Sequence, residues 1–319
     1  MDIILFIPGF IILLKSADWL VDGAGNIARY RGISELVVGL TIVAFGTSLP
    51  ELVVNLVSVS TGNTQIAIGN IFGSNVANVL LILGVAALFA PLKVASSTIK
   101  SEIPFSILAA LLVGFLANAH LFQESSGLLL SRIDGAILLF FFALFLLYVI
   151  QMSKDQNDSQ ETANSEEPLN LRKQYLLVGI GIVGLFLGGK FTVDGAVAIA
   201  DWIGLSKSFV GLTVIAVGTS LPELITSVVA ARKGRADMAV GNVVGSNIFN
   251  ILWILGLSAV IQPLPFDQIN NMDVLVIIFS ATLIVIFQVV GKYGRIRRTG
   301  GALLLLLYAA YIYYLWLRS

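Results

Sequence analysis

One motif of 11 residues occurs twice in the chain, each time inside a long apolar run. It reads TIVAFGTSLPE at Thr41–Glu51 and TVIAVGTSLPE at Thr213–Glu223. Proline has no backbone N–H to donate inside a helix. We therefore expect each helix to break near Pro50 or Pro222 and to leave backbone carbonyls without intrahelical partners. A glutamate in such apolar surroundings predicts a functional site.

The two motifs belong to an internal duplication of the whole chain. A shift of 172 positions (223 − 51) aligns Glu51 with Glu223 without a gap. In this alignment, 12 of the 17 residues at 36–52 are identical to those at 208–224. A match of this length predicts two structural repeats of the same architecture.

A second pair of motifs follows the glutamates and supplies further polar side chains. GNIFGSNVANVL occupies 69–80, and GNVVGSNIFNIL occupies 241–252. The polar residues recur every four positions, so on a helix each set forms one stripe. The stripes are Asn70, Ser74 and Asn78 in the first repeat, and Asn242, Ser246 and Asn250 in the second. Carboxylate, hydroxyl and amide oxygens from four helices predict a site for a hard cation.

The composition places these helices in a membrane. Hydrophobic residues make up 57% and charged residues 12% of the 319 residues, and the mean hydropathy is +0.93. We predict an all-α polytopic membrane protein in which broken helices 2, 3, 7 and 8 form the core. Hydropathy predicts ten transmembrane helices, at roughly 3–28, 34–60, 66–90, 102–121, 132–151, 174–201, 207–231, 237–261, 271–290 and 300–317.

The arrangement of the spans predicts two inverted repeats. The first repeat covers 1–151, a polar linker covers 152–174, and the second repeat covers 175–319. Each repeat has an odd number of spans, so the two must lie upside down relative to each other in the bilayer. With both termini outside, 14 of the 19 lysines and arginines fall in inner loops and three in outer loops. This bias predicts a multi-pass protein of the cell membrane with a cytoplasmic linker.

Inverted repeats bring Glu51 and Glu223 to opposite sides of a pseudo-two-fold axis near the middle of the bilayer. Two facing carboxylates in a low dielectric repel each other, so they require about two positive charges from one divalent ion or from two or more monovalent ions. Neutral oxygens suited to Ca²⁺ and Na⁺ are also available. They are the carbonyls near Ala44, Thr47, Ala216 and Thr219 and the hydroxyls of Ser48, Ser74, Ser220 and Ser246.

The doubled G-T-S-L-P-E motif, followed each time by G-N-x-x-G-S-N-x-x-N, resembles the alpha-repeats of the sodium/calcium exchangers, within the calcium/cation antiporter superfamily. The resemblance covers essentially the whole chain and is strongest to short prokaryotic members. It implies extrusion of Ca²⁺ driven by Na⁺ through alternating access, with the two ions competing for overlapping positions. It also implies that the first and sixth helices slide over a core made by the second, third, seventh and eighth.

The resemblance further implies a role for each matching residue. Glu51 and Glu223 would be shared carboxylate ligands, and Thr47 and Thr219 would offer backbone carbonyls to Ca²⁺. The Na⁺ ligands would be Ala44, Ser48 and Ser74 with their repeat partners Ala216, Ser220 and Ser246, and Asn78 and Asn250 would complete the centre. Some exchangers, including potassium-dependent ones, have Asp where this chain has Asn250, so the site here carries one carboxylate fewer.

Energetics set a minimum for the number of Na⁺ ions. Moving Ca²⁺ out against a ~10⁴ concentration gradient and ~100 mV costs about 10 kcal/mol. Each Na⁺ that enters down a ~10-fold gradient and the same potential returns about 3.7 kcal/mol. We therefore expect at least three Na⁺ per Ca²⁺, with net inward movement of charge.

Other functions fit parts of the pattern. An H⁺-coupled cation exchanger of the same fold is the nearest alternative, because paired glutamates can also carry protons. A passive channel is less compatible with inverted repeats around a midplane site. An intramembrane hydrolase lacks its chemical groups, since the chain has no Cys and one His. We expect no enzymatic activity, no cofactor and no nucleic-acid partner. We expect the protein to be a monomer that lies in the lipid bilayer and binds Ca²⁺ and Na⁺.

Two lysines fall inside the predicted spans. Lys15 lies three residues before Asp18, and Lys190 lies four residues before Asp194. Side chains at these spacings are neighbours on a helix surface, so we predict local ion pairs, or lysines that extend to the membrane interface, rather than a role in transport.

Overall fold

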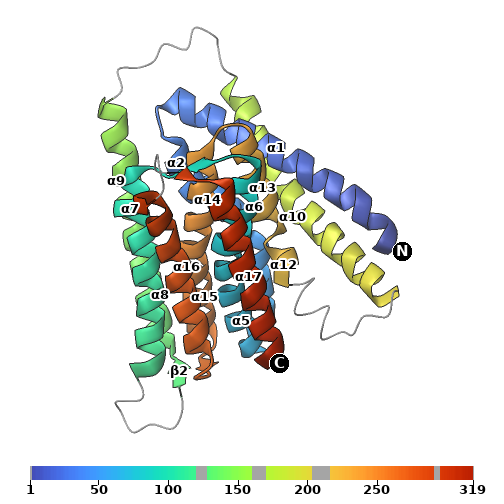
Figure 1. Cartoon of the computed structure of the whole chain (residues 1–319), viewed down its shortest axis with the longest axis vertical. Coiled ribbons are helices and arrows are strands. Elements are labelled where there is room, and N and C mark those ends of the chain that lie inside the picture. Colours follow the sequence, from blue (N-terminus) through green and yellow to red (C-terminus); the bar gives the residue numbers. More distant parts are fainter. Residues whose placement is uncertain (1, 120–127, 160–169, 203–215, 291–294, 319) are drawn as a thin grey trace.

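The computed structural model describes residues 2–119, 128–159, 170–202, 216–290 and 295–318, and these residues are mostly helical (Figure 1). The α-helices are α1 (Phe6–Arg31), α2 (Glu35–Val38), α3 (Ala44–Thr47), α4 (Leu49–Ser60), α5 (Thr64–Ala77), α6 (Leu83–Phe89), α7 (Ser96–Lys100), α8 (Glu102–Asn118), α9 (Arg132–Ser159), α10 (Leu171–Trp202), α12 (Ala216–Thr219), α13 (Leu221–Arg232), α14 (Ala236–Ile248), α15 (Leu255–Ile261), α16 (Asn270–Val290) and α17 (Arg298–Arg318). The strands are β1 (Leu92–Lys93), β2 (Leu128–Leu130), β3 (Leu264–Phe266) and β4 (Arg295–Ile296).

Helices occupy all ten ranges that hydropathy assigns to membrane spans, as far as those ranges are described. Seven helices of the described residues are long and apolar enough to cross a bilayer, and the bent pair Glu35–Thr47 and Leu49–Ser60 makes an eighth. α1 has the length of a span, 26 residues, but carries five charged side chains, namely Lys15, Asp18, Asp22, Arg29 and Arg31. The seventh predicted span is described only from residue 216 onward. The fold is a polytopic helical membrane protein, as predicted.

The third and eighth spans lie at the centre of the molecule. In both Thr64–Phe89 and Ala236–Ile261, 78% of the most apolar stretch is buried, against 17–39% in the other helices that qualify as single spans. The outer helices α8, α9 and α17 instead expose apolar side chains such as Leu108, Phe140 and Leu306. Lipid tails are as apolar as leucine, so this distribution fits a core of buried helices surrounded by helices that face lipid.

The predicted helix breaks occur at equivalent places in the two repeats. Ser48 separates α3 from α4, and Ser220 separates α12 from α13, with nearly identical backbone angles of φ −85°, ψ 7° and φ −88°, ψ 8°. The first break bends its span by 45°. A proline follows in the first turn of each second segment, where its missing N–H costs nothing. The third and eighth spans depart from α geometry through π-helical segments, Asn78–Ile82 and Phe249–Ile254.

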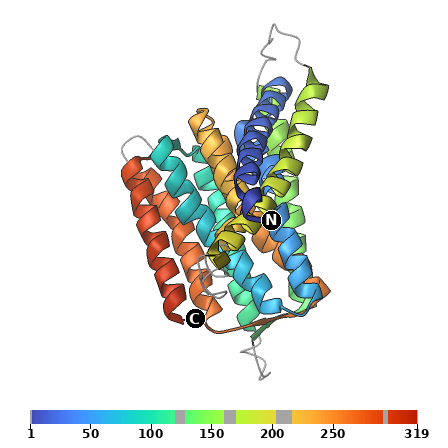
Figure 2. The same ribbon diagram turned by 90° about the vertical axis from the view of Figure 1, so that its right-hand side faces the viewer.

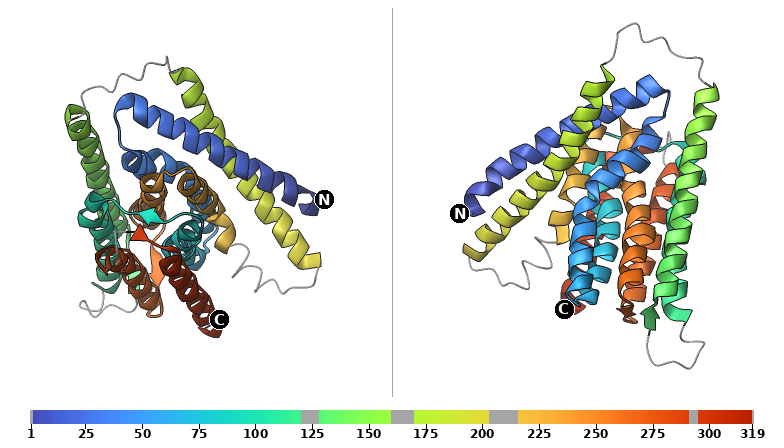
Figure 3. Two further views of the ribbon diagram at one scale, coloured as in Figure 1. Left: turned by 45° about the horizontal axis from the view of Figure 1, so that its top comes forward. Right: turned by 180° about the vertical axis from the view of Figure 1, so that it is seen from behind.

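α1 and α10 form an inclined pair that crosses one face of the core (Figures 1 and 2). The same two helices run side by side when the molecule is seen from behind (Figure 3). Glycines bring their backbones together: a Cβ at Gly188 would lie 2.7 Å from the Leu13 nitrogen, and a Cβ at Gly181 would lie 2.9 Å from the Leu20 nitrogen. Such close backbone contact favours movement of the α1/α10 pair as one unit.

Two short antiparallel ribbons connect the repeats. β1 pairs with β4, placing Lys93 opposite Arg295, and β2 pairs with β3, placing Leu128 opposite Phe266. Each ribbon takes one strand from each repeat, and the two ribbons lie at opposite ends of the core (Figure 1). Strands this short have no detectable periodicity in the sequence, which is why they are missing from the prediction.

Candidate ion-binding site

Glu51 and Glu223 lie in the first turns of α4 and α13, and each is 1% exposed. The first turn of a helix contains backbone N–H groups without intrahelical acceptors and is the positive end of the helix dipole. The two helix breaks therefore place both carboxylates where negative charge is stabilised, although they are surrounded by an apolar core.

The serines at the two breaks exchange hydrogen bonds between the repeats. Ser48 Oγ donates to Glu223 Oε1 at 3.0 Å, and Ser220 Oγ donates to Glu51 Oε1 at 3.3 Å. Each serine thus contacts the glutamate of the other repeat, 175 and 169 residues away in sequence. This reciprocal pattern brings the two broken helices together at a shared polar centre.

Several of the predicted site residues have buried polar atoms with no hydrogen-bond partner among the residues that the structure describes. These atoms are Glu51 Oε2, Glu223 Oε2, Ser74 Oγ, Ser246 Oγ, Asn78 Oδ1 and both polar side-chain atoms of Asn250. A buried polar group without a partner costs about 1–3 kcal/mol, and native structures rarely hold several of them. An oxygen-rich set of this kind fits the coordination preferences of Ca²⁺ and Na⁺.

The packing of the helices brings these groups to the broken helices. α13, which carries Glu223, contacts the π-helical segment Asn78–Ile82 of the first repeat. α4, which carries Glu51, contacts the segment Phe249–Ile254 of the second repeat, which contains Asn250. The described residues contain no cluster of three or more His, Asp or Glu. Negative charge at this centre therefore comes from the two glutamates.

Thr47 and Thr219 are held by amides of the opposite repeat. Thr47 Oγ1 donates to Asn242 Oδ1 at 3.1 Å, and Thr219 Oγ1 donates to Asn70 Oδ1 at 3.5 Å. Asn242 Nδ2 in turn donates to Ser227 Oγ at 2.9 Å. In the other repeat Asn70 Nδ2 donates to Asn55 Oδ1 at 2.8 Å. Asn70 and Asn242 thus position the threonines.

Ser227 and Asn55, the partners of these amides, are absent from the sequence-based site. Both are buried and occupy equivalent positions of the duplication, because 55 + 172 = 227. The presence of a polar side chain at the same position of both repeats is the sequence feature that could have identified them.

Asn78 is oriented by a contact between the central helices. Its Nδ2 donates to Asn247 Oδ1 at 2.9 Å, and Asn247 Nδ2 donates to the Asn75 carbonyl at 3.3 Å. Because the amide nitrogen of Asn78 is engaged, its Oδ1 atom is the group left for a cation. Asn247 itself lies one position off the polar stripe and joins the two central helices.

The carbonyl of Ala44 is partly engaged within the end of α3. It accepts a hydrogen bond from the Ser48 nitrogen at 3.0 Å, and Thr47 Oγ1 lies 3.3 Å away. Thr47 has one hydroxyl hydrogen, so when it donates to Asn242 Oδ1 the second lone pair of the Ala44 carbonyl is left for a cation. Ala216, its repeat partner, is the first residue of α12.

Comparisons with known proteins agree with this geometry. The family model for the sodium/calcium exchanger protein matches residues 1–151 and 173–317. The putative antiporter CaxA of Alkalimonas amylolytica is 38% identical over 319 residues, covering 98% of both chains. The sodium/calcium exchanger MaX1 of Methanosarcina acetivorans is 31% identical over 350 residues, covering 98% of this chain and 97% of that protein.

A solved structure of the sodium-calcium exchanger NCX_Mj, soaked with 2.5 mM Na⁺ and 1 mM Sr²⁺, superposes with a TM-score of 0.81. It is 32% identical in sequence, and the match covers 98% of this chain and 97% of that one. The shared fold, the two broken helices and the doubled motif support antiport of cations and Ca²⁺ by alternating access. The chain belongs to the sodium/calcium exchanger family.

Proposed function

We propose that this protein moves Na⁺ inward and Ca²⁺ outward at a site built around Glu51 and Glu223. Family membership supports the transport class. The observation that carries the proposal is the reciprocal bonding of Ser48 to Glu223 and of Ser220 to Glu51. It joins the broken helices at two buried carboxylates, each of which keeps one oxygen without a partner among the described residues.

The remaining ligands follow from the unpaired atoms and from the resemblance. In this proposal the two glutamates and the carbonyls of Thr47 and Thr219 bind Ca²⁺. Na⁺ binds at flanking positions, and Asn78 and Asn250 complete the centre. The flanking ligands are Ser48, Ser74 and Ala44 with their partners Ser220, Ser246 and Ala216. The Ala44 carbonyl accepts from the Ser48 nitrogen and keeps a second lone pair for Na⁺ while Thr47 donates to Asn242.

The proposal is tested by uptake of radioactive Ca²⁺ into proteoliposomes that are loaded with Na⁺ and diluted into Na⁺-free buffer at fixed pH. We expect Glu51→Gln and Glu223→Gln each to lower the initial rate by roughly 100-fold or more, because each removes a charge from a buried centre. Glu102→Gln is the matched control. Glu102 is also buried in a membrane helix and also keeps one oxygen without a partner among the described residues, but its hydrogen bond comes from Tyr148 of α9 and not from a serine of the broken helices.

The outcomes separate the alternatives. Uptake that follows only a pH gradient would assign the protein to the H⁺-coupled exchangers of the same fold. Uptake that is equal in wild type and both site variants would show that ions do not pass through the paired glutamates.

We also propose that at least three Na⁺ enter for each Ca²⁺ that leaves, so transport carries net charge inward. Two Na⁺ return about 7.4 kcal/mol against the roughly 10 kcal/mol that Ca²⁺ extrusion requires under ordinary gradients, whereas three return about 11 kcal/mol. An imposed membrane potential is therefore expected to change the exchange rate in the assay above. Exchange that is insensitive to the potential contradicts this stoichiometry.

For the orientation, we propose that both termini face the outside of the cell membrane and that the linker 152–174 is cytoplasmic. The repeats 1–151 and 175–319 are then inverted. The end of α1, the start of α10, the turn between α13 and α14 and the β1–β4 ribbon lie together at one end of the molecule, opposite both termini (Figure 1). These segments carry many of the lysines and arginines of the predicted inner loops, which supports this orientation.

A further inference from the structure

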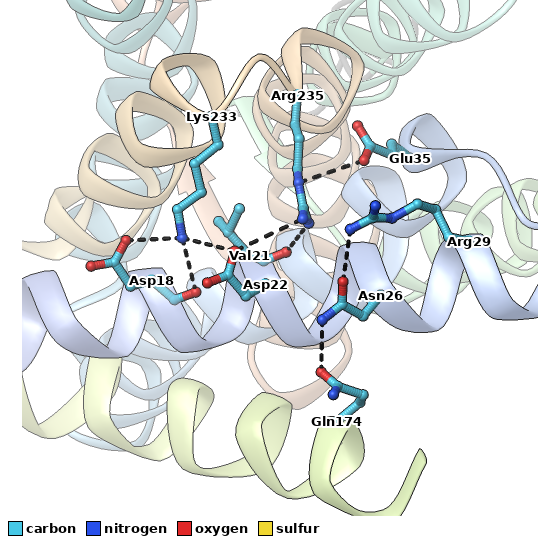
Figure 4. A network of polar contacts seen from close by, with 9 residues as sticks. All are labelled: Asp18, Val21, Asp22, Asn26, Arg29, Glu35, Gln174, Lys233 and Arg235. Atoms are coloured by element: carbon cyan, nitrogen blue, oxygen red, sulfur yellow. Dashed lines mark hydrogen bonds and ion pairs between the residues drawn. The ribbon is translucent and has the colours of Figure 1, made fainter. Parts of the chain in front are cut away.

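A network of ion pairs joins α1 to the core at the end of the molecule that we assign to the cytoplasm (Figure 4). Lys233 Nζ lies 3.0 Å from Asp18 Oδ1 and 2.8 Å from Asp22 Oδ1. Arg235 Nη2 lies 3.8 Å from Asp22 Oδ1, and its Nε lies 3.6 Å from Glu35 Oε1. Both aspartates belong to α1, whereas Lys233 and Arg235 lie in the turn between α13 and α14.

Arg235 is enclosed more deeply than the other members of this network. Its side chain is 13% exposed, and its Nη1 donates to the backbone carbonyl of Val21 in the middle of α1. A side chain at Gly25 would occupy the space that the guanidinium fills, so this glycine creates the seat for Arg235. Through Glu35 the same guanidinium also reaches α2, which belongs to the core.

The same end of α1 is tied to α10. Asn26 Nδ2 donates to Gln174 Oε1 at 3.0 Å, and Gln174 lies in the first turns of α10 (Figure 4). At Gly181 and Gly188 the backbones of the two helices are in close contact, and we call this contact the glycine seam. Together with the seam, the bond between Asn26 and Gln174 couples α10 to any displacement of α1. The turn that carries Lys233 and Arg235 therefore holds the α1/α10 pair as a unit.

The duplication provides an internal comparison at the other end. The turn 61–63 is equivalent to 233–235, because 61 + 172 = 233, and both turns contain a glycine with positive φ, Gly62 at 80° and Gly234 at 75°. Uncharged residues replace the lysine and arginine there. Thr61 Oγ1 donates to the Val57 carbonyl at 2.9 Å, and Asn63 Nδ2 donates to Thr61 Oγ1 at 3.1 Å. This turn thus bonds to itself.

The acidic positions of α1 are also changed in its repeat partner α10. Lys190 is the equivalent of Asp18, and it pairs with Asp194, the equivalent of Asp22, at 3.1 Å within α10. Among the described residues, no ion pair connects α10 with the turn 61–63. The charged connection therefore exists at one end only.

We propose that Asp18, Asp22, Lys233 and Arg235 form a one-sided latch that stabilises the access state of the described structure. The inference rests on the proposed function, since a latch has a role only if access alternates. Exact inverted repeats would make the two access states equivalent by symmetry, and a contact present at one end removes this equivalence. A slide of about one helical turn, about 5.4 Å, separates Lys233 from both aspartates. The latch thus sets the resting orientation and makes the two sides differ in apparent ion affinity.

The test follows the position of the α1/α10 pair directly. The chain has no cysteine, so spin labels can be placed on Val183→Cys of α10 and Val57→Cys of α4, two exposed positions outside the latch. Distance distributions are then measured by pulsed electron paramagnetic resonance in nanodiscs. We expect Lys233→Gln to raise the ratio of the second distance population to the first by roughly tenfold, which corresponds to about 1.4 kcal/mol.

Lys190→Gln is the matched control, because it breaks an ion pair that lies within one helix. It is expected to leave the distribution unchanged. Asp22→Asn should shift the ratio in the same direction as Lys233→Gln, and the double variant should shift it by less than the sum because the residues share contacts. If the distance distribution of Lys233→Gln equals that of Lys190→Gln, the latch proposal is wrong. Additive effects of the two latch variants overturn it as well.

Failure of the latch and failure of the proposed function are distinguishable. The exchange assay is run first on the labelled parent protein, without any latch substitution. If this protein shows no uptake of Ca²⁺ driven by Na⁺, the proposed function is wrong. If it exchanges the ions and the latch variants do not alter the distances, only the latch is wrong.

Discussion

At the residue scale, the proposed site gives the serines at the helix breaks two tasks. A hydroxyl has one hydrogen to donate and two lone pairs to offer. Ser48 and Ser220 use the hydrogen to fix the carboxylate of the opposite repeat, at 3.0 Å and 3.3 Å. Their lone pairs stay available to a cation. A serine can therefore orient the glutamate and serve as an ion ligand at the same time, which alanine cannot do.

Loss of either hydroxyl is expected to weaken Na⁺ binding. A hydrogen bond to a charged group contributes about 1.5–3 kcal/mol, so Ser48→Ala and Ser220→Ala should each raise the Na⁺ concentration for half-maximal exchange by roughly tenfold or more. The measurement is the Na⁺ dependence of Ca²⁺ uptake in proteoliposomes. Ser60→Ala is the control, since Ser60 is exposed on the same helix as Glu51 and bonds to the Val57 carbonyl. Equal Na⁺ dependence in the three variants would refute the assigned role.

At the element scale, glycines shape the surfaces on which α10 packs. On α10 itself they bring its backbone against α1. On the core they leave little side chain facing α10: a Cβ at Gly46 would lie 2.7 Å from Ile182 Cγ1, and a Cβ at Gly218 would collide with Val193. Both core glycines belong to the repeated G-T-S-L-P-E motifs. A surface without protruding side chains allows α10 to move along the core, whereas the close backbone contact between α10 and α1 favours joint movement of these two helices.

Two glycines of α10 provide a matched test of the seam. Alanine is favoured over glycine inside a helix by about 1 kcal/mol, so Gly179→Ala, whose new Cβ has nothing within 4 Å, should raise the melting temperature slightly. Gly188→Ala places a Cβ 2.7 Å from the Leu13 nitrogen, so the helices must separate and the melting temperature should fall. Thermal unfolding of both variants in the same detergent measures the difference. Equal shifts would mean that the seam does not constrain α1 and α10.

At the scale of the whole molecule, several contacts connect the two repeats. α1 packs on α10, α9 packs on α15, and α6 packs on α17. The ribbons β1–β4 and β2–β3 add one connection at each end of the core. Both repeats therefore contribute to the frame around the paired glutamates.

The proposed orientation predicts which exposed positions react from outside the cell. Tyr30→Cys near the end of α1 and Leu317→Cys near the end of α17 replace exposed side chains at opposite ends of the molecule. With a membrane-impermeant maleimide on intact cells, we expect labelling of Leu317→Cys, and labelling of Tyr30→Cys only after permeabilisation. The cysteine-free parent chain is the control for background labelling. The reverse pattern would invert the topology.

Much of the site could be predicted from the sequence, because its strongest signals are local. The positions of Glu51 and Glu223 in apolar runs, beside a proline and twice at the same spacing, are readable without contacts. The hydrogen-bond partners of the site residues cannot be read from the sequence in this way. Thr47 bonds to Asn242, 195 residues away, and Asn78 bonds to Asn247, 169 residues away. Such pairings depend on which helices pack against each other.

The sequence by itself determined the membrane class, the helical ranges as far as they are described, the duplication and the breaks near Pro50 and Pro222, because hydropathy, repetition and proline geometry act over short stretches of chain. Only the tertiary structure decided where the charges go. Local spacing predicts a pair between Lys15 and Asp18, but the ion pair of Asp18 is with Lys233, 215 residues later. Lys190 and Asp194 pair within their helix, as the spacing predicts. Asp18 and Asp194 differ in this way because the packing of the helices places the charged turn 233–235 against α1, whereas the equivalent turn 61–63 has no charged residue. Which turn meets which helix depends on contacts between distant parts of the chain.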